Sequence, residues 1–102
     1  MYLNENKDGN KVVLKLVGRL DTESSPDFEK RAKGISSDIK KLTVDMEEVE
    51  YVSSAGLRTL LAAQKAMEKK GGKMVVANPG EVVKEVFDIT GFNEVLNIDY
   101  GE

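Results

Sequence analysis

The chain has 102 residues, of which 15 are basic and 18 acidic, and its formal net charge is -3. This length is typical of one compact domain, so we expect residues 1–102 to form a single domain rather than a multidomain enzyme. Since the sequence has no excess of Lys and Arg to neutralise phosphates, it argues against direct binding of nucleic acid.

The sequence contains no Cys and no His. These absences exclude a disulfide framework, a thiolate zinc site, a thiol nucleophile and a Ser-His-Asp triad. The N-terminal residues hold no apolar signal core, and no apolar run reaches the ~20 residues that a membrane-spanning helix needs. We therefore expect a cytoplasmic protein without membrane insertion, and we predict neither a metal nor a cofactor.

The first predicted element is a β-hairpin. Asp8-Gly9 is a pair that tolerates positive φ in a tight turn. After the turn, Val12, Leu14 and Leu16 alternate with other residues at the two-residue period of a strand. The segment Gly18-Arg19-Leu20-Asp21 ends this strand.

A helix is predicted to begin at Ser25-Pro26, because Ser caps free amides and Pro suits the first helical position. Phe28, Ala32 and Ile35 then follow one another at helical spacing and form one buried stripe. The next predicted strand alternates over residues 42–46, and an acidic stretch at residues 47–50 leads out of it.

The second half of the chain alternates helices with strands. Residues 57–67 keep helical spacing until Gly71-Gly72 stops the run, and residues 74–77 form a short, buried strand. A turn at residues 78–80 precedes a last helix at 82–89, which Gly91 ends, and a weaker strand at 95–98. We expect four side chains of the longer helix to pack against the sheet: Leu57, Leu60, Leu61 and Met67.

The order strand, strand, helix, strand, helix, strand, helix, strand indicates an α/β fold. Strands that alternate with helices form parallel pairs through right-handed crossovers. The sequence therefore predicts a mixed, mostly parallel sheet with an antiparallel N-terminal hairpin and with helices packed against it.

The segment from Tyr51 to Arg58 is the best candidate for a functional site. A strand ends there, the hydroxyls of Ser53 and Ser54 follow, and a helix begins at once, so free amides and the helix dipole favour an anion. A capping box would place Glu or Gln three residues after the cap, where Gly56 or Leu57 stands instead. A Ser at this place is also an ordinary N-cap, and the two roles are compatible. Gly56 lets another backbone, or a kinase active site, come close.

Residues 44–57 resemble the signature of the STAS domain, the family of bacterial anti-sigma factor antagonists. Further matches follow in the family's order at residues 18–21, 71–76 and 86–92. The resemblance implies a binding switch. The unphosphorylated domain binds an anti-sigma factor that is also a serine kinase, phosphorylation by this kinase breaks the complex, and a serine phosphatase restores it.

The resemblance also implies which residues take part. Ser54 matches the family's phosphoacceptor, while Ser53 replaces the family's Asp and is a second candidate acceptor. Asp21 matches a loop Asp near the acceptor, where it places the hydroxyl, meets the partner or only supports a helix entry. Arg58 is a candidate to pair with a phosphate on Ser54, or is an ordinary exposed residue. The predicted partner-binding residues are Asp21, Ser53, Ser54, Gly56, Leu57 and Arg58.

Two other functions compete with this switch. A STAS domain can serve as a scaffold subunit of a lipid or anion transport system, which needs a docking surface but no kinase. An enzyme with a Ser nucleophile needs a general base near Ser54, and no local spacing supplies one, so we predict that the protein is not an enzyme. The acidic residues at 45, 47, 48 and 50 are more typical of a solvated edge than of a cation site.

Overall fold

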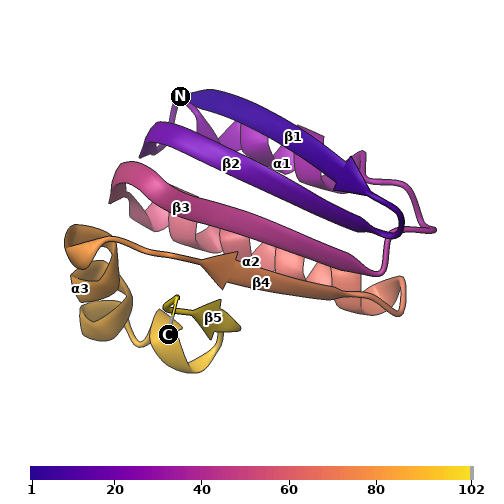
Figure 1. Cartoon of the computed structure of the whole chain (residues 1–102). Helices are drawn as coiled ribbons and strands as arrows, with labels where there is room; N and C mark the ends of the chain where they lie inside the picture. Colours follow the sequence, from indigo (N-terminus) through magenta and orange to yellow (C-terminus); the bar gives the residue numbers. More distant parts are fainter. Residues whose placement is uncertain (102) are drawn as a thin grey trace.

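A computed structural model describes residues 1–101 of the chain (Figure 1). Its elements follow one another in the order that the sequence predicts. They are β1 (Tyr2–Asp8), β2 (Lys11–Leu20), α1 (Ser25–Lys33), β3 (Lys41–Val52), α2 (Ser54–Lys69), β4 (Lys73–Ala77), α3 (Glu81–Thr90), the 3₁₀ helix η1 (Phe92–Glu94) and β5 (Ile98–Asp99).

The strands form one sheet in the order β1-β2-β3-β4-β5. β1 pairs with β2 in antiparallel fashion, whereas the other three pairings are parallel. The mixed sheet and its N-terminal hairpin are therefore confirmed. At the hairpin, Asp8 pairs with Lys11, and Gly9 takes a φ of 62°, a left-handed conformation that suits a glycine.

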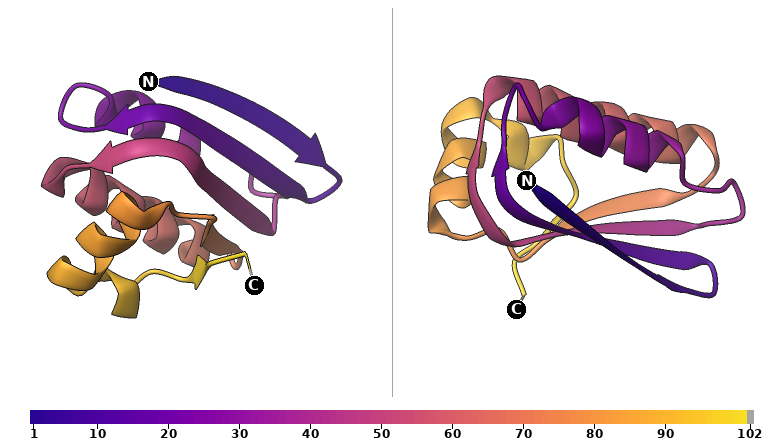
Figure 2. Two further views of the ribbon diagram at one scale, coloured as in Figure 1. Left: turned by 60° about the vertical axis from the view of Figure 1, so that its left-hand side comes forward. Right: turned by 90° about the horizontal axis from the view of Figure 1, so that it is seen from above.

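Two helices cover one face of the sheet. α1 and α2 lie side by side along that face, and α3 lies at one end of the sheet (Figure 2). Among residues 1–101 no helix covers the opposite face. The alternating residues of β2 and β3 point toward the helices, where they meet Phe28, Leu60 and Phe87 in the core. Of the four predicted core residues of α2, Leu57, Leu60 and Met67 are buried and Leu61 packs partly buried against the same core.

β3 is longer than the alternation at residues 42–46 predicts, because the acidic stretch belongs to the strand. Its pairing with β2 shifts register twice, between Lys15 and Val17 and between Gly18 and Arg19. Such irregularities admit extra residues into a strand without breaking it. On the uncovered face, Lys15 lies 2.8 Å from the carboxylate of Glu48, and this hydrogen bond raises the pKa of Lys15.

The start of α1 differs from the prediction by one residue. Ser24, not Ser25, is the N-cap residue, and its side chain makes no capping hydrogen bond to the helix. The Ser24 hydroxyl instead donates to the carbonyl of Arg19 at 2.7 Å and accepts from the N–H of Asp21 at 2.9 Å. Ser25 is buried as the first helical residue, with Pro26 directly after it.

The C-terminal elements agree with the prediction except for the last strand. Gly91 ends α3 with a φ of 78°, as its position after the helix implies. The expected strand at 95–98 is instead the two-residue strand Ile98–Asp99, because residues 95 and 96 turn back onto the Phe92 carbonyl after η1. Within residues 1–101, no helix is both long enough and apolar enough to span a membrane.

Candidate functional site

The two serines at the start of α2 have different roles. Ser53 is the N-cap residue: its backbone is extended, and its Oγ accepts a hydrogen bond from the N–H of Gly56 at 3.2 Å. Ser54 is the first residue of the helix, and its side chain is exposed. The cap and the exposed hydroxyl are therefore neighbouring residues rather than one residue with both roles.

The first turn of α2 offers a position for an anion. It contains no acidic residue, and among residues 1–101 the N–H groups of Ser54 and Ala55 donate to no other group. Because these amides point out of the helix start, a negative charge placed there is stabilised by about 0.3–1 kcal/mol. Ser54 is the first residue of this turn, and it is exposed.

Gly56 and Leu57 lie beneath the exposed serine. A Cβ built on Gly56 would stand 2.5 Å from the carbonyl oxygen of Leu20, so the helix start approaches the end of β2 closely. The same carbonyl accepts a hydrogen bond from the N–H of Ser53 at 2.9 Å. Leu57 is buried in the core. These two residues therefore fix where Ser54 stands. Both are buried and present little surface to a partner.

Asp21 supports its own loop. Its carboxylate accepts hydrogen bonds from the N–H groups of Glu23 at 3.1 Å and Ser24 at 3.2 Å. The bond from the Ser24 amide is the main reason that the pKa of Asp21 is lowered, and Arg19, 3.7 Å away, adds to the effect. Within the described chain, Asp21 makes no hydrogen bond to Ser54. Asp21 is connected to the start of α2 through the neighbouring Leu20, whose carbonyl accepts the hydrogen bond from the N–H of Ser53.

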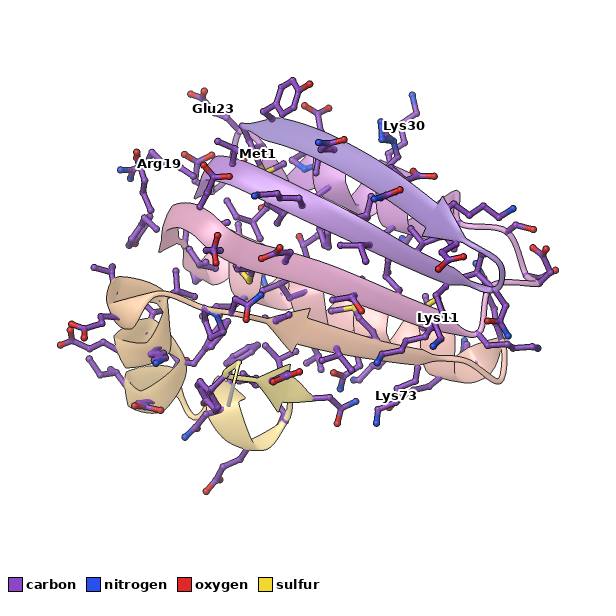
Figure 3. The ribbon with its side chains drawn as sticks, in the orientation of Figure 1. Met1, Lys11, Arg19, Glu23, Lys30 and Lys73 are labelled. Carbon is purple, nitrogen blue, oxygen red and sulfur yellow. The ribbon has the colours of Figure 1, made fainter. Side chains whose placement is uncertain are left out.

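Arg19 and Tyr51 join the site, although neither was among the predicted partner-binding residues. The guanidinium of Arg19 lies 4.9 Å from the centre of the Tyr51 ring, which is a cation–π contact. Arg19 and Glu23 stand at the end of the sheet where β2 leaves it (Figure 3). Arg19 belongs to the Gly18-Arg19-Leu20-Asp21 motif and Tyr51 begins the candidate segment at residues 51–58, but no local pattern indicates that the two side chains meet.

Arg58 is exposed and lies one helical turn after Ser54, on the same face of α2. It borders a hollow of about 360 Å³ between α1 and α2, together with Thr22, Ser25 and Ala55. The Ser25 hydroxyl is buried there without a hydrogen-bond partner in the described structure. The surface beside Ser54 is thus concave, and it carries one positive and one negative side chain, Arg58 and Glu29.

The acidic side chains near the end of β3 bond to groups of the sheet. In the described part of the chain, no Asp and Glu side chains gather in a group of three that could hold a metal ion. Asp45 accepts a hydrogen bond from the N–H of Glu47, and Glu48 pairs with Lys15, as on a solvated sheet face. Among residues 1–101 no side chain forms a hydrogen bond with the Ser54 hydroxyl.

The different positions of Ser53, the cap, and Ser54, the exposed first helical residue, predict different stabilities for two alanine variants. Ser53→Ala should lower the free energy of unfolding by about 0.5–2 kcal/mol, because the N–H of Gly56 loses its acceptor. Ser54→Ala should change it by less than about 0.5 kcal/mol, because an exposed side chain is removed without loss of a bond. Urea denaturation of both variants measures the difference. Equal losses would contradict the assignment of Ser53 as the cap.

The chain is similar to known proteins in sequence and in fold. The anti-sigma-B factor antagonist of Bacillus subtilis (strain 168) is 26% identical over 89 residues, which cover 87% of this chain and 82% of that protein. An anti-sigma factor antagonist from Mycobacterium paratuberculosis has a similar structure, with a TM-score of 0.83, 21% identity, and coverage of 96% of this chain and 84% of that one.

The anti-sigma factor antagonist SpoIIAA shares the fold in two states. Its unphosphorylated form has a TM-score of 0.78 and its phosphorylated form, from Bacillus, one of 0.73. Both are 17% identical to this chain and cover 95% of it, with 87% and 90% of their own chains matched. The sequence model of the STAS domain matches residues 2–101. The chain therefore belongs to the STAS domain family.

Proposed function

We propose that the protein is an anti-sigma factor antagonist controlled by phosphorylation of Ser54. In the unphosphorylated form it binds an anti-sigma factor that is also a serine kinase, and the phosphorylated form releases this partner. The observation that carries the proposal is the exposed Ser54 hydroxyl at the open start of α2. The name of the Bacillus subtilis relative supports the class of partner.

The physical effect of a phosphate differs between the fold and the interface. Phosphorylation adds about −1.5 to −2 charges, which the free amides and the helix dipole tolerate. The two solved forms of SpoIIAA support this tolerance, because they share one fold. Within a complex the same charge loses its water, and an uncompensated buried charge costs several kcal/mol. Since ~1.4 kcal/mol is tenfold in affinity, the complex dissociates while the domain stays folded.

The neighbours of Ser54 have distinct parts in this mechanism. Arg58, one turn along α2, pairs with the phosphate and keeps it over the helix start. Asp21, through its loop, and the half-buried Ser53 border the contact with the partner. Gly56 and Leu57 act from below by holding the helix start in place. Ser54 is favoured over Ser53 as the acceptor, because the Ser53 oxygen is already engaged by the Gly56 amide.

The proposal predicts opposite binding behaviour for two Ser54 variants. Ser54→Ala should bind the anti-sigma kinase like the wild type, because Ala adds no charge. Ser54→Asp should bind at least about tenfold more weakly, since a carboxylate at the interface must also be desolvated. Isothermal titration calorimetry against an anti-sigma factor kinase of the same organism measures both affinities. Incubation with kinase and ATP, followed by mass spectrometry, should place one phosphate on Ser54 in the wild type only.

Control measurements separate the competing functions. Glu68→Gln changes an exposed charge far along α2 and should leave the affinity unchanged. Phosphate on Ser53 in place of Ser54 would overturn the assignment of the acceptor but keep the mechanism. Equal affinity of wild type, Ser54→Ala and Ser54→Asp, with no phosphate on any of them, would refute the switch and leave a scaffold such as a transport subunit.

A further inference from the structure

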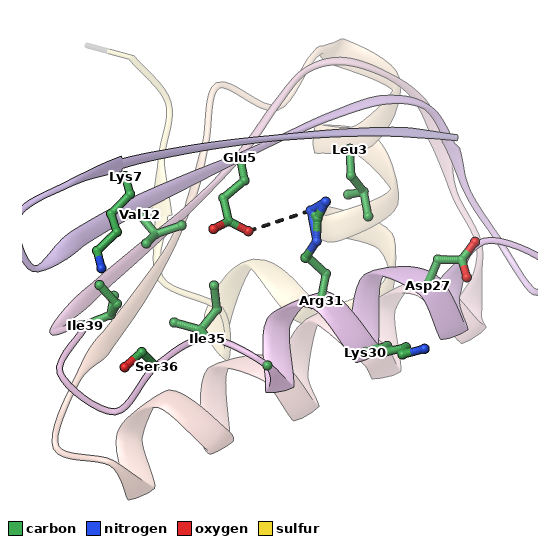
Figure 4. Close-up of a pocket in the computed structure, with 11 residues that line it drawn as sticks. Leu3, Glu5, Lys7, Val12, Asp27, Lys30, Arg31, Ile35, Ser36 and Ile39 are labelled. Carbon is green, nitrogen blue, oxygen red and sulfur yellow. Dashed lines mark ion pairs between the residues drawn. The ribbon is translucent and has the colours of Figure 1, made fainter.

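A second region of the molecule has the features of a small-molecule site. Between β1 and α1 lies a cavity of about 550 Å³ (Figure 4). Known ligand pockets have volumes of about 300–1,000 Å³. None of its lining residues belongs to the Ser54 site, so it is independent of the switch. The lining residues are Leu3, Glu5, Lys7, Val12, Asp27, Lys30, Arg31, Gly34, Ile35, Ser36 and Ile39.

The floor of this cavity is apolar. Val12 comes from β2, whereas Ile35 and Ile39 come from the segment that follows α1, and Leu3 closes one end from β1. The first three side chains belong to the buried core, and Leu3 packs against it. An apolar group that enters the cavity therefore meets aliphatic carbon at its base rather than unsatisfied polar atoms.

The rim of the cavity carries charge on both walls. Glu5 and Lys7 project inward from β1, and Lys30 and Arg31 come from α1. The cations outnumber the carboxylates of Glu5 and Asp27 by three to two. Arg31 bridges the walls to Glu5 at 3.7 Å, which is too long for a strong hydrogen bond. Lys7 and Lys30 form no ion pair within residues 1–101.

Protection of a sheet edge explains only part of this arrangement. β1 is an edge strand, and inward-pointing charges on such a strand discourage pairing with another chain. This accounts for Glu5 and Lys7 on β1. It does not account for Arg31 and Lys30 on the opposite wall, since they belong to a helix and face the same cavity.

We infer that this cavity binds an amphiphilic monoanion: a carboxylate held by Arg31 at the rim, with an aliphatic chain of about six to eight carbons along the floor. An Arg guanidinium suits a carboxylate because it presents paired N–H donors in one plane. The aliphatic chain of the ligand covers Val12, Ile35 and Ile39, and its removal from water gives the free energy of apolar burial. Glu5 competes with the anion, because its own carboxylate already pairs with Arg31.

The test uses sodium hexanoate, sodium octanoate and 1-octanol as probes of the purified chain. Isothermal titration calorimetry should give one saturable site for octanoate. Hexanoate should bind about 10- to 15-fold more weakly, because two methylene groups fewer are buried. 1-Octanol should bind at least about tenfold more weakly than octanoate, because it lacks the charge that Arg31 recognises. Absence of saturable octanoate binding, or equal affinities of octanoate and 1-octanol, would overturn the inference.

Two variants at the rim should act in opposite directions. Arg31→Gln should weaken octanoate binding about tenfold, and Glu5→Gln should strengthen it, since each removes one partner of the same ion pair. Lys33→Gln on the same helix breaks an exposed pair with Glu29 and should leave binding unchanged. If Arg31→Gln and Glu5→Gln shift the affinity in the same direction, the pair only supports the fold and the inference fails.

The location is checked by two-dimensional NMR of the amide groups during titration with octanoate. Shifts should concentrate in β1 and α1 and in residues 35–39 between α1 and β3. Shifts confined to α3, where Val82 and Ile89 expose 55% and 77% of their surface, would overturn the assignment to this cavity. Ser54→Ala should bind octanoate like the wild type, so that failure here and failure of the proposed switch can be told apart.

Discussion

Replacement of Leu60 by Ala should lower the free energy of unfolding by about 2–5 kcal/mol. Leu60 has no exposed surface, and it stands in the middle of α2 on the side that meets the sheet. Removal of its side chain forfeits the burial of the lost atoms and leaves a cavity that close-packed neighbours cannot fill. The total free energy of unfolding of such a domain is about 5–15 kcal/mol, so the expected loss is a large share of it.

The adjacent residue offers a matched control. Leu61→Ala removes the same atoms from a side chain that packs against the core but is only partly buried. Its expected loss is smaller, below about 2 kcal/mol, because less surface returns to water. Urea titrations followed by circular dichroism measure both values. If Leu60→Ala cost no more than Leu61→Ala, α2 would not be seated on the sheet as the structure has it.

Gly56→Ala should lower the free energy of unfolding by about 1–3 kcal/mol. The new Cβ would stand 2.5 Å from the Leu20 carbonyl oxygen and 3.0 Å from side-chain atoms of Leu20 and Val52. The first of these neighbours is backbone and cannot rotate away, so α2 must move outward. That movement also stretches the hydrogen bond from the Ser53 amide to the same carbonyl.

Gly80→Ala is the control for Gly56→Ala. Gly80 precedes α3 with a φ of −73°, and a Cβ built there meets nothing within 4 Å. The expected change is below about 1 kcal/mol, since only a cap preference and the entropy of the unfolded chain are altered. Chemical denaturation of both variants gives the comparison. Equal stability of the two would mean that α2 can separate from the end of β2 at no cost.

Much of the fold could be predicted because the pleat of a strand enforces a period of two. The alternation at residues 12–16 and 42–46 reports directly which side chains meet the helices, and the structure buries them. The end of β3 was not predictable in the same way. Its acidic residues have low strand preference, and pairing with β2 across two register shifts overrides that preference.

The candidate site was predictable in position but not in detail. The sequence locates two hydroxyls between a strand and a helix, yet either serine could cap the first turn, and only the backbone geometry assigns the cap to Ser53. Two adjacent serines also precede α1, and there the cap is Ser24 rather than the predicted Ser25. The contacts of Arg19 with Tyr51 and of Gly56 with Leu20 join residues far apart in the chain, so no local pattern reveals them.

Ser53 is the N-cap of α2, whereas Ser54 is the proposed phosphoacceptor, and this division bears on how fast the protein is degraded in a cell. Degradation of a small domain follows the population of its opened form, and that population depends on the free energy of unfolding. In the proposed switch, phosphorylation of Ser54 leaves the Ser53–Gly56 hydrogen bond in place and adds a charge that the helix dipole favours, so the phosphorylated form opens no more often than the unmodified one at this helix start. Its turnover is then no faster, and such a circuit changes the occupancy of the partner without depleting the protein.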